Sequence, residues 1–158
     1  MSARTRALDA RLLEERADWR NAGRRLVLTN GCFDLLHSGH GALLELARAL
    51  GDVLVVAINS DESVRGLKGP GRPLLPERER RELLLALEPV DRVAIYDEGT
   101  PLEVVRALLP DVLVKGADWG PDNIVGSDVV RARGGDVVRI PLVAGRSTSA
   151  ILERVRRL

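Results

Sequence analysis

Short aliphatic runs alternate with stretches of helical periodicity along this chain, and that alternation restricts the fold more than any other feature. The run at residues 53–58 is almost entirely aliphatic, which is typical of a strand covered on both faces in a parallel sheet. Four similar runs predict strands at residues 26–29, 93–96, 111–115 and 137–140. Because strands that alternate with helices form parallel sheets, we expect an α/β fold with helices on both faces of the sheet.

Helices are predicted between these strands, where apolar residues recur every three or four positions. They cover residues 6–22, 38–51, 77–87, 101–108, 127–133 and 148–157, and Ser38 is the expected N-cap of the second. The polar stretch at residues 59–76 is rich in glycine and proline and is predicted to be a long functional loop. A chain of 158 residues that is 45% hydrophobic fits one globular domain, so we expect an N-terminal helical extension, 1–24, followed by a single domain, 25–158.

Composition excludes several classes of protein. A formal net charge of +1 and 3% aromatic residues argue against a nucleic-acid binder, which needs a basic field or stacking platforms. The single cysteine, Cys32, excludes a disulfide framework and a zinc site built on several cysteines. No apolar run approaches the ~18 residues of a membrane span, and the first residues lack the apolar stretch of a signal peptide. We therefore expect a cytoplasmic protein with neither a nucleic-acid nor a membrane partner.

Polar clusters follow the first, second and fourth predicted strands, and parallel strands should bring them together at one edge of the sheet. They read TNGCFDLLHSGH, NSDESVRGLKGPGRP and KGADW. The glycine fingerprint of dinucleotide-binding folds and the P-loop pattern are both absent. If this edge binds phosphate, it must do so with other groups.

Two histidines stand out within the first cluster. His37 and His40 are the only histidines of the chain and lie in the first turn of a predicted helix, where free N–H groups and the positive end of the helix attract anions. Imidazoles placed there can donate hydrogen bonds to a phosphoryl group whose charge shifts during a reaction, and Gly39 lets a ligand approach the backbone. The alternatives are a solvated surface pair or half of a metal site.

The lysines are also unusual. The chain has 24 Lys and Arg residues, yet only Lys68 and Lys115 are lysines, and a glycine follows each. That usage indicates two sites that need a compact ammonium rather than a planar guanidinium. Lys68 and Arg72 would form a cationic flap over phosphates, and Lys115 with Asp118 follows a strand at the ligand-binding edge. Solvated surface charges or a structural ion pair are the alternatives.

Four more positions are candidates, each with an ordinary structural alternative. Arg80 lies in a charge-dense helix start, where most arginines are solvated. Asp34 could orient a histidine or a ligand hydroxyl, or bond its own backbone. Ser147 and Thr148 offer hydroxyls at the start of the last helix, or an N-cap. Cys32, in contrast to these four, has no marks of a nucleophile and is expected to be a small, half-buried residue.

Taken together, these blocks resemble the H-x-G-H nucleotidylyltransferase superfamily and, within it, the D-glycero-β-D-manno-heptose 1-phosphate adenylyltransferases. The resemblance spans residues 20–155 through TNGCFDLLHSGH, VAINSDESVRGLKGPGRP, VKGADW and RSTSAILERV. Gly41, Ala117 and Trp119 depart from the residues usual in that family. We also expect a stand-alone form of a domain that is often fused to a sugar kinase.

This resemblance implies a Rossmann-like nucleotidylyltransferase fold with a five-stranded parallel sheet. It implies adenylyl transfer from ATP to heptose 1-phosphate, giving ADP-heptose and pyrophosphate for heptose-containing glycans such as the lipopolysaccharide core. Mg²⁺ held mainly by the phosphates is the implied cofactor, and a homo-oligomer is expected. The alternatives are cytidylyl transfer to glycerol 3-phosphate or a similar small phosphate, or a non-catalytic nucleotide-binding protein. A tRNA-charging fragment is disfavoured by the short chain and its small net charge.

The resemblance also assigns roles to residues. It implies that His37 and His40 contact the α-phosphate and that Lys68 bridges the phosphates of the two substrates. The residues expected to bind ATP and its phosphates are Thr29, Gly31, Cys32, Phe33, Arg80, Ser147 and Thr148. Those expected to position the substrate or nucleotide are Asn30, Asp34, Arg72, Lys115, Gly116 and Asp118.

Overall fold

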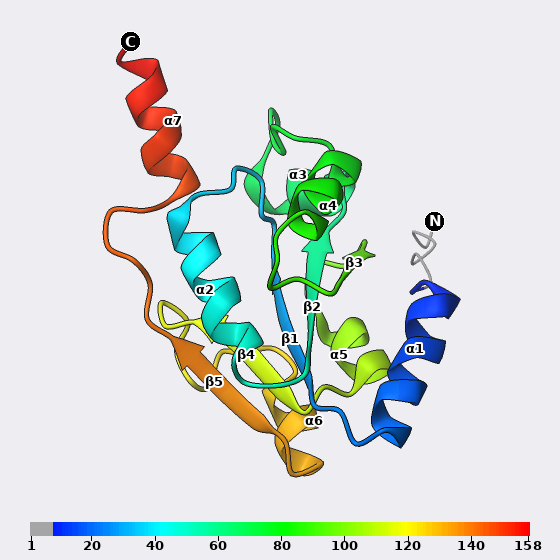
Figure 1. Ribbon diagram of the computed structural model, residues 1–158. Helices are drawn as coiled ribbons and strands as arrows, with labels where there is room; N and C mark the ends of the chain where they lie inside the picture. The colour runs from blue at the N-terminus through cyan, green and yellow to red at the C-terminus, as the bar shows by residue number, and fades with distance from the viewer. Residues whose placement is uncertain (1–7) are drawn as a thin grey trace.

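A five-stranded parallel sheet forms the centre of the computed structural model, which describes residues 8–158 (Figure 1). Its strand order is β3-β2-β1-β4-β5, and every neighbouring pair is parallel. The strands are β1 (Leu26–Gly31), β2 (Val53–Asn59), β3 (Arg92–Tyr96), β4 (Val112–Gly116) and β5 (Asp136–Ile140). The predicted fold class and all five predicted strands are therefore confirmed.

Helices cover both faces of the sheet. The described helices are α1 (Ala10–Asn21), α2 (Ser38–Arg48), α3 (Asp61–Lys68), α4 (Glu77–Leu85), α5 (Leu102–Leu108), α6 (Ser127–Ala132) and α7 (Thr148–Arg156). Leu12 of α1, Leu108 of α5 and Val130 of α6 pack on one face, and Leu44 of α2 and Leu84 of α4 pack on the other. Aliphatic side chains thus fill two cores, one on each side of the strands, which explains the nearly continuous aliphatic runs in the sequence.

The central position of β1 in the sheet determines where a ligand-binding crevice can open. From β1 the chain proceeds outward to β2 and β3, then crosses back to β4 on the other side of β1. In such sheets the connections leave β1 and β4 on opposite sides, and a crevice opens at their carboxyl ends. The polar clusters of the sequence follow these strand ends, so the fold brings them to one place.

One predicted loop contains a helix. Residues 61–68, assigned to the long loop, form α3, and the hydroxyl of Ser60 caps it by accepting a hydrogen bond from the Ser63 N–H at 3.2 Å. Asp61 and Glu62 add negative charge to its first turn, which favours the helix. The loop prediction was wrong there because α3 buries a single large apolar side chain, Val64, and so leaves little periodic signal.

The N-terminal helix is anchored to the sheet layers. The predicted helix covered residues 6–22, whose first two residues lie outside the described part, and α1 accounts for most of the rest. Arg16, 4% exposed, donates from Nε to the Leu108 carbonyl at 2.8 Å and from Nη2 to the Leu109 carbonyl at 2.7 Å. Its guanidinium thus fastens α1 to the end of α5.

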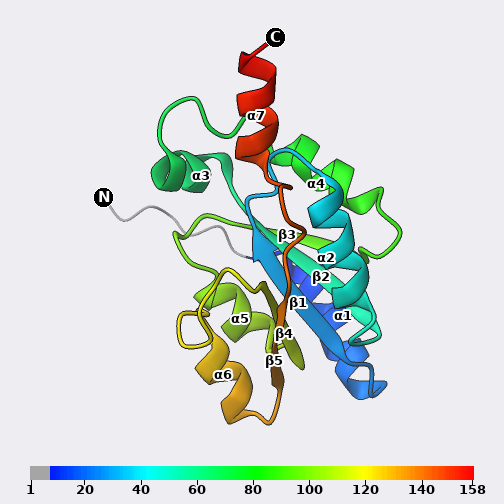
Figure 2. The same ribbon diagram turned by 90° about the vertical axis from the view of Figure 1, so that its left-hand side faces the viewer.

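Helix α7 lies apart from these layers, beyond the carboxyl edge of the sheet in both views (Figures 1 and 2). None of its residues is buried. The Thr148 hydroxyl ties its first turn to the loop after β1 by donating to the Leu35 carbonyl at 3.3 Å. No helix in residues 8–158 is long and apolar enough to cross a membrane.

Two glycines with positive φ allow a matched test of packing against backbone strain. A Cβ at Gly126 (φ +86°) would lie 2.8 Å from Cγ2 of Val105, which is fully buried, whereas a Cβ at Gly134 (φ +77°) would meet nothing within 4 Å. We expect Gly134→Ala to lower the free energy of unfolding by about 1 kcal/mol through backbone strain. Gly126→Ala should lower it by a further ~1–3 kcal/mol through overpacking. Urea unfolding measures both, and equal losses would contradict this packing of α5 on α6.

Candidate active site

A cavity of about 510 Å³ opens at the carboxyl edge of the sheet. Ten residues predicted for the site line it: Thr29, Asn30, Gly31, Cys32, Phe33, His40, Lys68, Lys115, Gly116 and Asp118. A second cavity of about 160 Å³ is lined by His37 and Ser147. The two cavities are adjacent, because the His37 and His40 rings stack with their centroids 3.8 Å apart. Of the other predicted residues, Asp34, Arg72, Arg80 and Thr148 line neither cavity.

The two histidines cap the helix that carries them. His37, not the predicted Ser38, is the N-cap of α2, and its Nδ1 accepts a hydrogen bond from the Gly39 N–H at 3.1 Å. His40 reaches back, and its Nδ1 accepts from the His37 N–H at 3.3 Å. The pair forms a reciprocal capping box in which imidazoles take the place of the usual Ser and Glu side chains.

This capping box determines where each imidazole carries its proton. A nitrogen that accepts a hydrogen bond has no hydrogen, so a neutral ring with Nδ1 as acceptor carries its proton on Nε2. Burial first, and then the charges of His37 and Lys68, lower the pKa of His40 to about 4. Burial and the neighbouring Arg146 also lower the pKa of His37. Both rings are therefore neutral hydrogen-bond donors through Nε2 near neutral pH.

Both lysines of the chain line the large cavity. Lys68 is the last residue of α3, and its charge acts on His40. Lys115, at the end of β4, donates to the Asn30 carbonyl at 3.2 Å, and its ammonium lies 4.9 Å from the centre of the Trp119 ring. Burial lowers the pKa of Lys115, and Asp118 partly opposes that shift. The cavity thus offers two ammonium groups to an anion.

The small cavity combines cations with the start of a helix. His37 shares it with Arg146, Ser147 and Arg154. Ser147 is the N-cap of α7, and its hydroxyl accepts from the Ala150 N–H at 3.1 Å. Two guanidinium groups beside a helix N-terminus suit an anion. Arg154 was not predicted as a site residue, because it lies two turns into α7, where the charged residues are typical of a solvent-exposed helix face.

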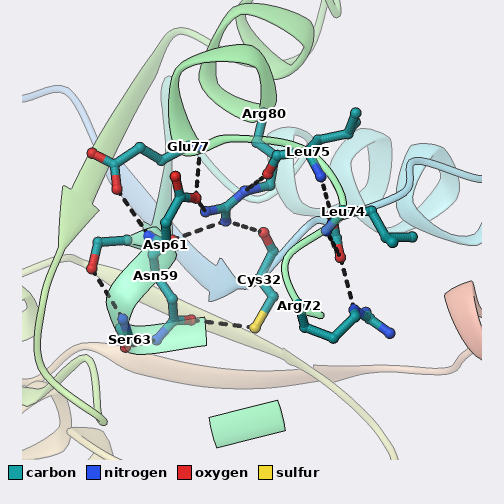
Figure 3. A network of polar contacts seen from close by, with 11 residues as sticks. Cys32, Asn59, Asp61, Ser63, Arg72, Leu74, Leu75, Glu77 and Arg80 are labelled. Carbon is teal, nitrogen blue, oxygen red and sulfur yellow. Dashed lines mark hydrogen bonds and ion pairs between the residues drawn. The ribbon is translucent and has the colours of Figure 1, made fainter. Parts of the chain in front are cut away.

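Arg80 requires a correction. It was predicted to bind the β- and γ-phosphates, but it is 1% exposed, and oxygen atoms of the protein already occupy its guanidinium (Figure 3). Nη1 donates to the carbonyls of Cys32 at 2.7 Å and Asn59 at 2.9 Å, Nε donates to the Leu75 carbonyl at 3.0 Å, and Nη2 pairs with Asp61 at 2.8 Å. Arg80 therefore joins the ends of β1 and β2 to the segment before α4.

Asp34 and Arg72 fasten the glycine-rich segment to the loop after β1, and neither lines the two cavities. Figure 3 shows Arg72 beside Leu74 and Leu75. Asp34 accepts from Arg72 Nε and from the N–H groups of Leu74 and Leu75, all at 2.9 Å. Burial alone would raise the pKa of Asp34, but these donors outweigh it and lower that pKa. Thr148 is similarly occupied by its bond to the Leu35 carbonyl. Asp34, Arg72 and Thr148 therefore hold the loops around the site in place without lining either cavity.

Several lining residues were missed by sequence reasoning. Asn59 and Tyr96 end the second and third strands and reach the cavity floor. One part of the cavity has an apolar surface, formed by Leu142, Val125 and Trp119, the last of which differs from the residue usual in the family. A usable signal for Asn59 and Tyr96 was present, because each is a polar group at the carboxyl end of an aliphatic run.

Carboxylates are scarce at the site. Within residues 8–158 no group of three or more His, Cys, Asp or Glu side chains is arranged to hold a metal ion. Asp118 is the one acidic residue among those that line the two cavities in this part of the chain. This donor set fits a divalent ion held mainly by a ligand's phosphates, with at most one protein carboxylate.

Comparison with known proteins gives consistent matches. A family model described as cytidylyltransferase-like matches residues 28–144. Bifunctional protein HldE of Azorhizobium caulinodans is 56% identical over 89% of this chain and 29% of its own length. The same-named protein of Geotalea uraniireducens is 51% identical over 98% of this chain and 31% of its own length. The chain thus spans about three tenths of these relatives.

A solved structure is similar in fold as well as in sequence. It is described as the lipopolysaccharide core biosynthesis protein from Thermoplasma volcanium. It matches with a TM-score of 0.63 and 30% identity, covering 77% of this chain and 98% of that chain.

The role assigned to Arg80 can be tested against the phosphate-binding role first predicted. We expect Arg80→Met to lower the free energy of unfolding by about 3 kcal/mol, because Asp61 and three carbonyls lose their partner. Arg81→Met, at the exposed neighbouring position, should change it by less than about 0.5 kcal/mol. Urea unfolding measures both variants. A stable Arg80→Met whose KM for nucleotide rises would instead favour the phosphate role.

The capping box also predicts a pH dependence of stability. The unfolded chain protonates its histidines near 6.5, whereas folded His40 resists protonation down to about 4. Between these values the unfolded state binds more protons, so the free energy of unfolding should fall as the pH falls from 6.5 to 4 and should be fully present above 6.5. His40→Asn keeps an oxygen acceptor for the His37 N–H but cannot titrate. Urea unfolding across this range should show a shallower slope for the variant, and identical slopes would contradict the account.

Proposed function

This chain belongs to the cytidylyltransferase-like family, and from that premise we propose that it transfers AMP from ATP to D-glycero-β-D-manno-heptose 1-phosphate. The products are ADP-heptose and pyrophosphate, and the activated sugar serves heptose-containing glycans such as the lipopolysaccharide core. Two kinds of match support this: long relatives named bifunctional protein HldE and a solved structure described as a lipopolysaccharide core biosynthesis protein. The several sequence blocks shared with heptose 1-phosphate adenylyltransferases point the same way.

The observation that carries the proposal is the pair of neutral imidazoles between two cation-lined cavities. A phosphate oxygen of the sugar phosphate attacks the α-phosphorus of ATP, a new P–O bond forms, and the bond to the β-phosphate oxygen breaks to release pyrophosphate. The attacking phosphate is already anionic near neutral pH, so no residue has to remove a proton. Placement and charge stabilisation then provide the catalysis.

His37 and His40 are suited to the α-phosphate. Their Nδ1 atoms are held by the N–H groups of Gly39 and His37, so each Nε2–H is oriented before substrate binds. Donors fixed in advance stabilise the charge that develops on phosphate oxygens without reorganising.

The remaining phosphates fit the cations around them. The β- and γ-phosphates occupy the small cavity beside Arg146 and Arg154, at the start of α7. Lys68, at the rim of the large cavity, bridges the phosphates of the two substrates. Mg²⁺ held mainly by the phosphates would supply positive charge to offset that of the leaving pyrophosphate, and Asp118 of the large cavity is the one carboxylate among the described lining residues that could assist in holding it.

The nucleobase fits the apolar end of the large cavity. Trp119, Val125 and Leu142 line it beyond β4 and β5 and offer a surface for a planar ring. Lys115 lies against Trp119 and limits the movement of that side chain. The base is thereby separated from the polar floor formed by the ends of β1, β2 and β3.

We expect purified protein with Mg²⁺ and heptose 1-phosphate to release pyrophosphate with ATP and not with CTP. His40→Ala should lower kcat by about 10²–10³-fold, since it removes one preorganised donor to the transition state. A coupled pyrophosphate assay measures both effects. Glu45→Ala, at an exposed position of the same helix, is the matched control and should leave kcat unchanged.

Release with CTP alone would replace adenylyl by cytidylyl transfer. No release with either nucleotide would contradict the enzymatic proposal. Full activity of His40→Ala would contradict the role given to the imidazoles.

A further inference from the structure

A chain of hydrogen bonds connects a backbone carbonyl behind the site to the floor of the large cavity. The Ser63 hydroxyl donates to the Glu98 carbonyl at 2.8 Å. Asn59 Nδ2 donates to Ser63 Oγ at 2.9 Å, and both residues are labelled in Figure 3. The Tyr96 hydroxyl donates to Asn59 Oδ1 at 3.0 Å, and Asn30 Nδ2 donates to the Tyr96 oxygen at 3.3 Å. We call Ser63, Asn59, Tyr96 and Asn30 the amide relay.

Three strands bring this relay together on one face of the sheet. Side chains alternate along a strand, and Leu28, Ala57 and Ala94 all pack in the core beneath α5. The residues two positions further along β1, β2 and β3 are Asn30, Asn59 and Tyr96, so they project to the same side at the carboxyl edge. Parallel pairing therefore builds a polar row from single residues at three strand ends.

The direction of every bond in the relay is fixed from its buried end. A carbonyl oxygen can only accept, so Ser63 must donate to the Glu98 carbonyl and must accept from Asn59 Nδ2. The Asn59 amide is thereby oriented with Oδ1 toward Tyr96. The Tyr96 hydroxyl donates its hydrogen to Asn59 Oδ1, and its oxygen accepts a hydrogen bond from Asn30 Nδ2. The amide of Asn30 consequently has one defined orientation.

Burial keeps the relay intact. Ser63, Asn59 and Tyr96 are 7%, 3% and 2% exposed, so little water competes for their bonds. Burial, which outweighs the hydrogen bonds from Asn30 and to Asn59, raises the pKa of Tyr96 to about 12. The phenol therefore keeps its proton near neutral pH and remains a donor to Asn59.

Asn30 is the relay member with bonding capacity left for a ligand. It is half-buried and lines the cavity, and within residues 8–158 its Oδ1 has no partner. Lys115 Nζ lies nearby, 3.2 Å from the Asn30 carbonyl oxygen. The Asn30 side chain and Lys115 both line the cavity, so they offer an acceptor and an ammonium that together match a hydroxyl group, which donates one hydrogen bond and accepts another.

We propose that Asn30, oriented by the amide relay, recognises a hydroxyl of the acceptor sugar, and that Tyr96, Asn59 and Ser63 are positioning residues for acceptor specificity. This inference rests on the proposed function, since it assumes a sugar phosphate acceptor. The sugar hydroxyl donates to Asn30 Oδ1 and accepts from Lys115. The relay spans β3, β2 and β1, and Lys115 of β4 lies between its Asn30 end and Trp119 of the apolar surface assigned to the base.

The test compares two acceptors that share a phosphate but differ in hydroxyls: heptose 1-phosphate and methyl phosphate. Calorimetry should show that Tyr96→Phe raises the Kd for heptose 1-phosphate about tenfold, because the Asn30 amide loses its fixed orientation. Methyl phosphate and ATP should bind as they do to the wild type. In steady state, KM for the sugar phosphate should rise while kcat and KM for ATP stay within about twofold.

A double-mutant cycle separates this role from a structural one. Asn30→Ala should weaken the binding of heptose 1-phosphate to the same degree. In the Asn30→Ala background, Tyr96→Phe should cause no further loss of affinity. Ser63→Ala, which removes a relay group that does not line the cavity, should act in the same direction. Ser63→Thr retains the hydroxyl and should restore binding to within about threefold of the wild type.

Additive losses of affinity in the double variant, or equal weakening of methyl phosphate and heptose 1-phosphate binding, would contradict the proposed role of the amide relay. Because Asn30 lies at the cavity wall, Asn30→Ala keeps the test decisive even if Tyr96→Phe folds poorly. The two proposals fail differently. A wild type that turns over heptose 1-phosphate while the variants bind it normally contradicts the relay alone, whereas a wild type that releases no pyrophosphate contradicts the proposed function.

Discussion

Parallel pairing in the order β3-β2-β1-β4-β5 is the constraint on which the rest of the site depends. It brings the ends of all five strands to one edge, so that residues distant in sequence, such as Asn30, Asn59 and Lys115, border one cavity. It also places β1 at the point where the chain crosses from one half of the sheet to the other. The large cavity opens there, as expected for open parallel sheets.

Buried polar bonds then hold the loops at that edge in place. Arg80 binds the carbonyls of Cys32 and Asn59 and so couples the ends of β1 and β2, while Asp34 gathers the backbone of Leu74 and Leu75. Neither side chain faces a cavity. Because folding already orders these loops, the groups that face a substrate need little rearrangement when it binds.

The sequence predicted the architecture well, because aliphatic runs and their spacing are direct consequences of a covered parallel sheet. It also placed most lining residues correctly, since polar groups after strands β1 and β4 converge in any such fold. It failed at Arg80, because a charge-dense helix start gives no sign that one arginine turns inward. It also missed α3, whose single large buried apolar side chain, Val64, leaves almost no periodicity.

The sequence could not show how polar groups are oriented. The spacing of His37 and His40 suggested a shared helix face, but not that each ring would spend its Nδ1 on a backbone N–H. The amide relay was equally hidden, because its members lie 29, 37 and 4 positions apart and meet only through strand register. Residue types and spacing indicated a phosphate site, whereas the direction of each hydrogen bond depends on the three-dimensional arrangement of the strand ends.

Both histidines act as neutral donors through Nε2, and because the chain has only two histidines the protonation of each ring is directly measurable. Nitrogen-15 NMR of the imidazole rings at neutral pH distinguishes the two neutral tautomers from the doubly protonated form. We expect two neutral rings protonated at Nε2, with the Nε2–H signals shifted when ATP and Mg²⁺ are added. Rings protonated at Nδ1, or an imidazolium at either position, would contradict this assignment.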